Sequence, residues 1–220
     1  MSEPHVHPDG SDHDHPGIVP DSKPPYYPQR IRAIEALLVE KGVLTPDEVQ
    51  HQIDYIESRS PALGARIVAR AWVDPEYKAR LLKNAKTAAA ELGIDASGVS
   101  EITAVENTES VHNLIVCTLC SCYPRPILGR PPDWYKSFNY RSRAVVEPRA
   151  VMAEFGFEVD DDVEVRVHDS TADMRYLVLP QRPAGTDGWS EEQLAALVTR
   201  DSMIGVSTPR LEPVPAASGS

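Results

Sequence analysis

The segment Val116-Cys117-Thr118-Leu119-Cys120-Ser121-Cys122-Tyr123 contains all three cysteines of the 220-residue chain, in a C-x-x-C-x-C spacing. Cysteines this close together cannot connect distant parts of a chain, and an odd number leaves one unpaired, so a secreted disulfide scaffold is excluded. A run of strand-forming residues leads into the segment. The sequence therefore predicts a metal or redox site where a strand leaves its sheet for a loop.

Several kinds of thiol site fit part of this pattern. A structural zinc site needs four ligands, and only His112 is close enough in sequence to be the fourth. An iron–sulfur cluster normally has four cysteine ligands, and a thioredoxin-like C-x-x-C has no use for a third cysteine. Three thiols that act only as small buried hydrophobic groups would not be expected to cluster.

A further possibility uses the backbone. If the amide nitrogens of Ser121 and Cys122 lose their protons, they form a near-square plane with the sulfurs of Cys120 and Cys122, and Cys117 supplies an axial sulfur. Thiolates are strong, soft ligands. An amide proton is very weakly acidic, so this arrangement requires a strongly Lewis-acidic trivalent ion. One octahedral position then stays open for water or a substrate.

The charge balance excludes some classes of partner. There are 22 Lys and Arg against 33 Asp and Glu, a net charge of −11, so we expect neither a nucleic-acid nor a membrane partner. Hydrophobic residues make up 41% and charged residues 25%, as in ordinary globular proteins. No apolar run reaches the roughly 18 residues of a membrane span, and the start lacks a secretion signal. We therefore expect a cytoplasmic location.

Composition and periodicity divide the chain into four regions. We expect a disordered His- and Pro-rich arm over 1–27, an N-terminal helical region over 28–100, a metal-binding α/β sandwich domain over 101–207, and a flexible tail over 208–220. The fold class is α+β, with an extended helical arm followed by a layered α-β-β-α domain.

Local signals predict the individual elements. Capping boxes are expected at Thr45-Pro46-Asp47-Glu48 and Ser190-Glu191-Glu192-Gln193. Ser60-Pro61 and Asp74-Pro75 mark two further helix starts, and the second of these helices is expected to run to Gly93. Strands are expected over 102–105, 114–117, 163–168 and 175–179, a turn rich in Pro and Gly over 123–132, and a helix around 148–155.

The cysteine segment and its flanks, Val111–Val116 and Pro131–Ser137, resemble the alpha subunit of nitrile hydratase. The resemblance continues through Tyr140–Arg143, Tyr176–Trp189 and Val198–Gly205. It covers the chain from about Tyr27 to Gly205, and the cysteine motif is highly specific.

The resemblance implies one non-corrin Co(III) or Fe(III) ion per chain. Its ligands would be the sulfurs of Cys117, Cys120 and Cys122 and the backbone nitrogens of Ser121 and Cys122. It also implies a sulfinate at Cys120 and a sulfenate at Cys122, with Cys117 left as a thiolate. Thr118 and Tyr123 match the cobalt branch of the family, so we expect cobalt rather than iron.

The activity implied by the resemblance is the hydration of a small nitrile to an amide. The metal would polarise the nitrile or activate water, and the sulfenate oxygen of Cys122 would act as base or nucleophile. The hydroxyl of Ser121 could form a hydrogen bond in the pocket. The family also implies a beta subunit, in a heterodimer or heterotetramer, whose arginines neutralise the oxidised sulfurs, and an activator or metallochaperone protein.

Arg125 departs from the family pattern, in which Trp is usual. The related thiocyanate hydrolase metal subunit has Arg at this place, and we expect Arg125 and Tyr123 to line the substrate channel, although a solvated surface arginine fits equally well. Two other functions therefore stay open: a thiocyanate hydrolase-like subunit that forms carbonyl sulfide and ammonia, and a non-catalytic cobalt carrier.

Overall fold

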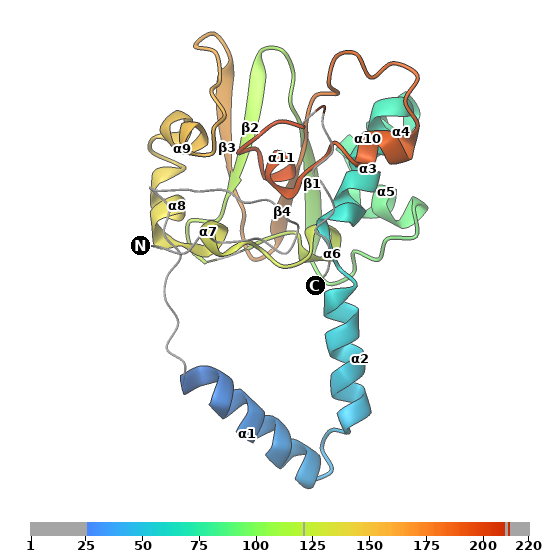
Figure 1. Cartoon of the computed structure of the whole chain (residues 1–220), viewed down its shortest axis with the longest axis vertical. Coiled ribbons are helices and arrows are strands. Elements are labelled where there is room, and N and C mark those ends of the chain that lie inside the picture. Colours follow the sequence, from blue (N-terminus) through green and yellow to red (C-terminus); the bar gives the residue numbers. More distant parts are fainter. Residues whose placement is uncertain (1–25, 121, 210, 212–220) are drawn as a thin grey trace.

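The computed structural model describes residues 26–120, 122–209 and 211 (Figure 1). The arm predicted over 1–27 and the tail predicted over 208–220 therefore lie largely outside the described residues. The first helix begins at Tyr26, two residues before the predicted start of the helical region.

In the described part of the chain, groups of helices are separated by two pairs of consecutive strands. The helices are α1 (Tyr26–Glu40), α2 (Pro46–Glu57), α3 (Pro61–Val73), α4 (Pro75–Lys83), α5 (Ala85–Glu91), α6 (Arg125–Leu128), α7 (Asp133–Lys136), α8 (Phe138–Arg143), α9 (Pro148–Glu154), α10 (Glu191–Ala195) and α11 (Arg200–Ile204). The strands are β1 (Glu101–Glu106), β2 (Val111–Val116), β3 (Glu164–Asp169) and β4 (Met174–Leu179). Each predicted strand overlaps one of these four.

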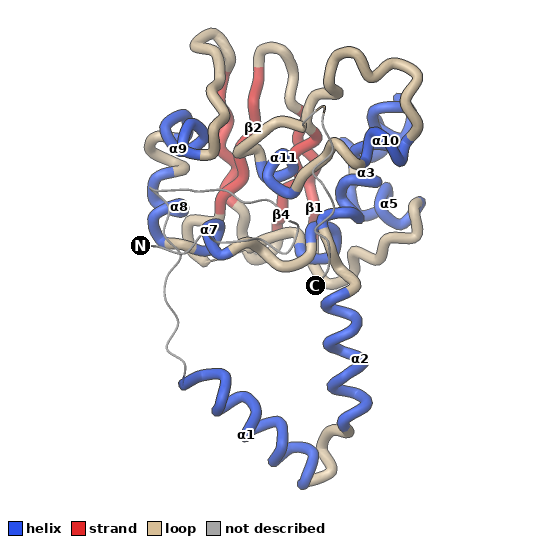
Figure 2. The backbone as a smooth tube through the Cα atoms, viewed as in Figure 1, coloured by secondary structure: helices blue, strands red, loops and turns tan. Residues whose placement is uncertain are grey.

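The strands form two small parallel sheets in the middle of the body (Figure 2). β1 pairs with β4, and β2 pairs with β3. Figure 1 shows α9 on the side of β3 and the helices α3 to α5 on the side of β1 and β4, in agreement with the contacts between these elements. This arrangement confirms the predicted α+β class.

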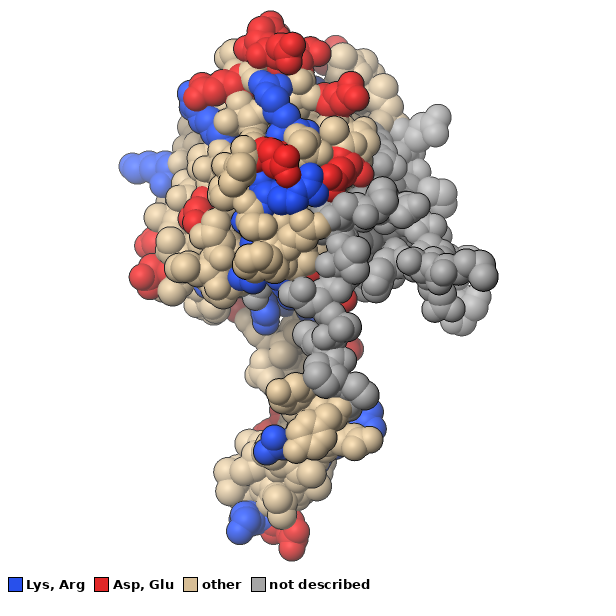
Figure 3. Space-filling view, turned by 90° about the vertical axis from the view of Figure 1, so that its left-hand side faces the viewer, with Lys and Arg blue, Asp and Glu red and all other residues tan. Residues whose placement is uncertain are grey.

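The helices α1 and α2 form an arm that projects from the body (Figure 1 and Figure 3). Neither helix has a buried residue. The apolar side chains of α1 are exposed, for example 64% of Ile31 and 54% of Ile34. The predicted capping box at Thr45 is confirmed, because its hydroxyl accepts from the amide of Glu48 and the Glu48 carboxylate accepts from the amide of Thr45. The arm is therefore helical through its local sequence rather than through packing against the body.

The helices α3, α4 and α5 supply one side of the hydrophobic core. One prediction here was wrong: the helix expected from Pro75 to Gly93 is two helices. Asn84 ends α4 and begins α5, and its side-chain oxygen accepts a hydrogen bond from the amide of Thr87 at 2.9 Å. An asparagine side chain that bonds the local backbone favours a helix start over a helix interior.

Buried polar contacts fix β2 at the centre of the body. His112 Nε2 lies 2.7 Å from the carbonyl oxygen of Gly205, and His112 Nδ1 lies 3.1 Å from the side-chain amide of Asn107. Gly205 has a φ of 97°, and a Cβ there would lie 2.0 Å from the carbonyl oxygen of Asn113. Only glycine permits this close approach of α11 to β2.

No helix within the described ranges is both long enough and apolar enough to cross a membrane.

Candidate metal centre

The strand β2 leads directly into the cysteine loop. Its residues from His112 to Val116 are buried, and Cys117, the next residue, is 0% exposed. Val116 also accepts a hydrogen bond from the amide of Ser170 at 2.7 Å, which continues the pairing with β3 beyond the end of the strand. Cys117 is therefore held at a fixed place, while Cys120 is exposed and Cys122 is partly exposed.

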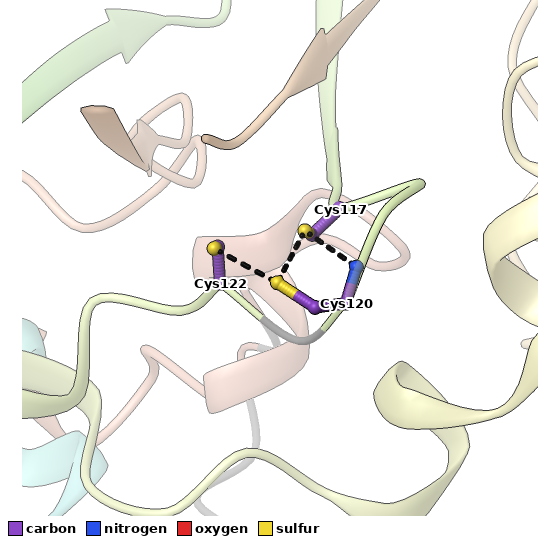
Figure 4. Close-up of side chains that lie close together, drawn as sticks. All are labelled: Cys117, Cys120 and Cys122. Atoms are coloured by element: carbon purple, nitrogen blue, oxygen red, sulfur yellow. Dashed lines mark hydrogen bonds between the residues drawn. The ribbon is translucent and has the colours of Figure 1, made fainter. Parts of the chain in front are cut away.

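The three cysteine side chains point toward one another (Figure 4). The sulfur of Cys120 lies 3.5 Å from that of Cys117 and 3.2 Å from that of Cys122. All three sulfurs lie within 4.8 Å of one another. We call the loop from Cys117 to Cys122 the claw. It brings together the three sulfur ligands that the sequence predicts.

The sulfur separations fit a right-angled ligand arrangement better than a tetrahedral one. Two sulfurs bound at a right angle, about 2.3 Å from one ion, are about 3.3 Å apart, whereas tetrahedral ligands are about 3.8 Å apart. The observed separations of 3.2 and 3.5 Å lie near the first value. The sulfurs therefore fit the edges of a square or octahedral site.

His112 does not complete a zinc site. Both of its ring nitrogens are engaged in the buried network with Asn107 and Gly205. Among the described residues, the cluster of potential metal ligands around the claw consists of the three cysteines alone. The tetrahedral zinc hypothesis thus lacks its fourth ligand.

The surroundings that this chain provides favour the neutral thiol of Cys122. Burial, with the adjacent thiols of Cys120 and Cys117, raises the pKa of Cys122 to about 12, and the positive charge of Arg175 opposes this effect. Thiolates bind metals and thiols do not, so a bound cation must drive the ionisation and release protons. Ionisation of the Cys122 thiol in these surroundings therefore requires a bound cation.

Three side chains outside the claw hold its backbone. Asp169 accepts from the amide of Thr118 at 2.9 Å and from its hydroxyl at 2.6 Å. Arg141 Nη1 donates to the carbonyl of Cys120 at 3.1 Å, and the hydroxyl of Tyr135 donates to the carbonyl of Cys122 at 2.9 Å. The beginning, middle and end of the claw are each fixed by a residue from another element.

The sequence did not reveal these holding residues. Asp169 is opposite Val116 in the parallel register of β2 and β3, and the predicted third strand ended one residue before it. Knowledge of that strand pairing would have identified Asp169. Arg141 and Tyr135 lie in blocks that carry the family resemblance, but no pattern in the sequence indicated their contacts with the claw.

Two of the remaining predicted site residues, Tyr123 and Arg125, are described by the structure, and one is buried while the other is exposed. Ser121 lies outside the described residues. The ring of Tyr123 is buried and packs edge-on against Tyr135, with ring centroids 5.1 Å apart. Arg125 is exposed at the start of α6, within the stretch predicted only as a turn. Arg125 therefore lies in solvent, three residues after the end of the claw.

The fold and this site define a protein that gathers three cysteines of one surface loop around a single metal position. The family model described as "Nitrile hydratase, alpha chain" matches residues 26–207. The chain belongs to this family.

Individual relatives support the same assignment. The chain is 58% identical over 181 residues to the low-molecular weight cobalt-containing nitrile hydratase subunit alpha of Rhodococcus rhodochrous, covering 82% of this chain and 87% of the relative. It is 42% identical over 189 residues to the thiocyanate hydrolase subunit gamma of Thiobacillus thioparus, covering 81% and 78%.

A solved structure has the same fold. A double mutant of the Fe-type nitrile hydratase of Comamonas testosteroni Ni1 superposes with a TM-score of 0.81 at 40% identity. The match covers 90% of this chain and 100% of that chain.

Proposed function

We propose that this chain is the metal-binding alpha subunit of a cobalt nitrile hydratase, which hydrates nitriles to amides together with a beta subunit. The observation that carries the proposal is the claw, in which sulfur separations of 3.2 and 3.5 Å fit one metal ion. The identity of 58% to a cobalt-containing alpha subunit supports cobalt as the metal.

The proposed ligands are the sulfurs of Cys117, Cys120 and Cys122 and the backbone nitrogens of Ser121 and Cys122. A trivalent ion at this position would supply a Lewis acid that polarises the carbon–nitrogen triple bond. The buried Cys117 anchors the site to β2, and the partly exposed Cys122 lies where a small molecule can approach it.

We further propose that Cys120 is oxidised to a sulfinate and Cys122 to a sulfenate. The oxygen on Cys122 would take a proton from water or attack the nitrile carbon. The thiol of Cys120 is the most exposed of the three, which gives an oxidant access to it.

Nitrile is favoured over thiocyanate as the substrate. The identity to the nitrile hydratase subunit is 58%, against 42% to the thiocyanate hydrolase subunit. The exposed Arg125 is the observation that keeps thiocyanate as the second candidate, because a cation near the claw would attract an anionic substrate.

The experiment is to express the chain with its beta subunit and an activator protein, and to supply a simple aliphatic nitrile and thiocyanate in parallel. We expect about one cobalt per chain, an intact mass raised by about three oxygens as the proposed two oxidations require, and amide as the product. Turnover of thiocyanate alone would contradict the nitrile assignment. Cobalt that is lost rapidly to a mild chelator, with no turnover of either substrate, would favour the carrier function.

We propose that the protein is located in the cytoplasm. All three cysteines lie in the claw, so the chain has none left for the disulfides that proteins of oxidising compartments commonly use.

A further inference from the structure

We propose that Arg141 is a positioning residue of the metal centre: it holds Cys120 through its carbonyl and offsets the negative charge of the metal-bound claw. This inference rests on the proposed metal-binding function and deepens it. The family resemblance implied that the cations around the cysteines come from the beta subunit, whereas Arg141 belongs to this chain.

The helix that carries Arg141 is fixed to the strand that leads into the claw. Ser137 is the N-cap of α8, and its hydroxyl oxygen accepts from the amide of Tyr140 at 3.1 Å. The Tyr140 hydroxyl in turn donates to the carbonyl of Ile115 on β2 at 2.6 Å. Arg141 follows Tyr140 directly, so its position relative to the claw is set by this contact. Its Nη1 donates to the carbonyl of Cys120 at 3.1 Å.

Arg141 differs in charge balance from Arg143, the other arginine of α8. Arg143 forms ion pairs with both Glu147 and Glu154. Within the part of the chain that the structure describes, Arg141 has no carboxylate partner, and its Nε is buried without a hydrogen-bond partner. A buried donor in this state costs stability unless an acceptor is supplied. The Arg141 guanidinium thus has an unused donor and an unneutralised charge near the claw.

The claw is the nearby group that becomes negative. Its ligands must be deprotonated to bind a metal, and three thiolates with two amide anions around a trivalent ion leave about two net negative charges. A guanidinium hydrogen-bonded to the same loop reduces the cost of that charge. Because the guanidinium contacts Cys120 rather than the buried Cys117, the contribution falls on the exposed side of the claw.

The test compares Arg141→Gln and Arg141→Lys with Arg143→Gln as the matched control on α8. Each full-length chain, expressed with its partner and freed of metal under reducing conditions, is titrated with Cd²⁺. The affinity is read from the thiolate-to-cadmium absorption, and thermal unfolding is recorded for every variant. Glutamine keeps a hydrogen-bond donor but not the charge, and lysine keeps the charge but not the planar fork.

We expect Arg141→Gln to bind Cd²⁺ about tenfold more weakly than the wild type, on the order of one charge-assisted hydrogen bond. Arg141→Lys should recover part of that loss. Arg143→Gln should unfold at a lower temperature and keep the wild-type affinity.

Wild-type affinity in Arg141→Gln, or equal losses in the glutamine and lysine variants, would overturn the charge assignment. The readout does not depend on cobalt or on nitrile turnover. A wild type that binds Cd²⁺ but shows no nitrile hydration would therefore contradict the proposed function alone, and the comparison between variants would still decide the role of Arg141.

Discussion

Asp169 accepts two hydrogen bonds from Thr118, one from its amide at 2.9 Å and one from its hydroxyl at 2.6 Å. The carboxylate stands at the end of β3, opposite Val116 on β2. The parallel pairing of the two strands thus brings an acceptor to the first turn of the claw, between the first two cysteines. The conformation of the claw therefore depends on a residue that is distant in the sequence.

Replacing Asp169 with Asn should weaken metal binding. Both carboxylate oxygens of Asp169 accept from Thr118, but the side-chain nitrogen of asparagine cannot accept. One charge-assisted hydrogen bond is therefore lost, and we expect the metal affinity of the chain to fall about fivefold. Metal analysis after equilibration with a competing chelator measures the change. Thr118→Ser keeps both donors and serves as the control; equal metal retention in Asp169→Asn and the wild type would contradict this role of Asp169.

Serine substitutions at Cys117 and Cys120 should separate metal binding from folding. Both remove a soft sulfur ligand, so we expect both to lose most of the bound metal. Cys117 is buried and Cys120 is exposed, so only Cys117→Ser places a hydroxyl in the core, at a cost of about 1–3 kcal/mol. Metal analysis and chemical denaturation under reducing conditions measure the two effects. A Cys117→Ser chain as stable as the Cys120→Ser chain would be inconsistent with the buried position.

Arg125→Gln should weaken the binding of anionic thiocyanate and leave the turnover of a neutral nitrile nearly unchanged. The exposed guanidinium attracts anions through a partly screened charge. We expect kcat/KM for the nitrile to change by less than about twofold and the affinity for thiocyanate, tested as substrate and as competitive inhibitor, to fall about two- to fivefold. The thiocyanate effect should shrink at high salt. An unchanged affinity for thiocyanate would place Arg125 outside the channel.

The stability of the chain should decrease between pH 7 and pH 5 because of two histidines in the β2–β3 sheet. Burial lowers the pKa of His112, and burial together with the charge of Arg166 lowers that of His168, both from 6.5. A histidine whose pKa is lowered by folding binds protons less readily in the folded chain than in the unfolded chain. Its contribution to stability is therefore complete above about pH 6.5 and is lost as the pH falls below that value. Denaturant titrations at several pH values measure the slope.

The variant His168→Gln provides the comparison for this pH effect. His168 Nε2 lies 2.8 Å from the side-chain oxygen of Asn113, and glutamine can retain a donor there without titrating. We expect a shallower slope in this variant. A slope as steep as that of the wild type would assign the acid sensitivity to other groups.

Local signals in the sequence were sufficient for much of the fold. The capping boxes at Thr45 and Ser190 are present as predicted, because they depend only on residues three apart. The break at Asn84 was missed, since the same residue is tolerated inside a helix and only its side-chain bond to Thr87 distinguishes the two cases. The short helices α7, α8 and α11 were also missed, because each is shorter than two turns and lacks a readable period.

The candidate site was likewise predicted only in part. Its three sulfur ligands lie within six residues, so their convergence could be predicted from spacing. Asp169, Arg141 and Tyr135 reach the claw through strand pairing and helix packing. Such contacts depend on the tertiary arrangement, and no local pattern in a single sequence encodes them.

The exposed arm has a consequence for the turnover of the protein. A helix such as α1, with no buried residue and with Ile31 and Ile34 exposed, opens at little free-energy cost, and the turn at Lys41–Leu44 that follows it is accessible. Proteases and chaperones act on segments of this kind. A chain without its partner would therefore be cut first in this arm.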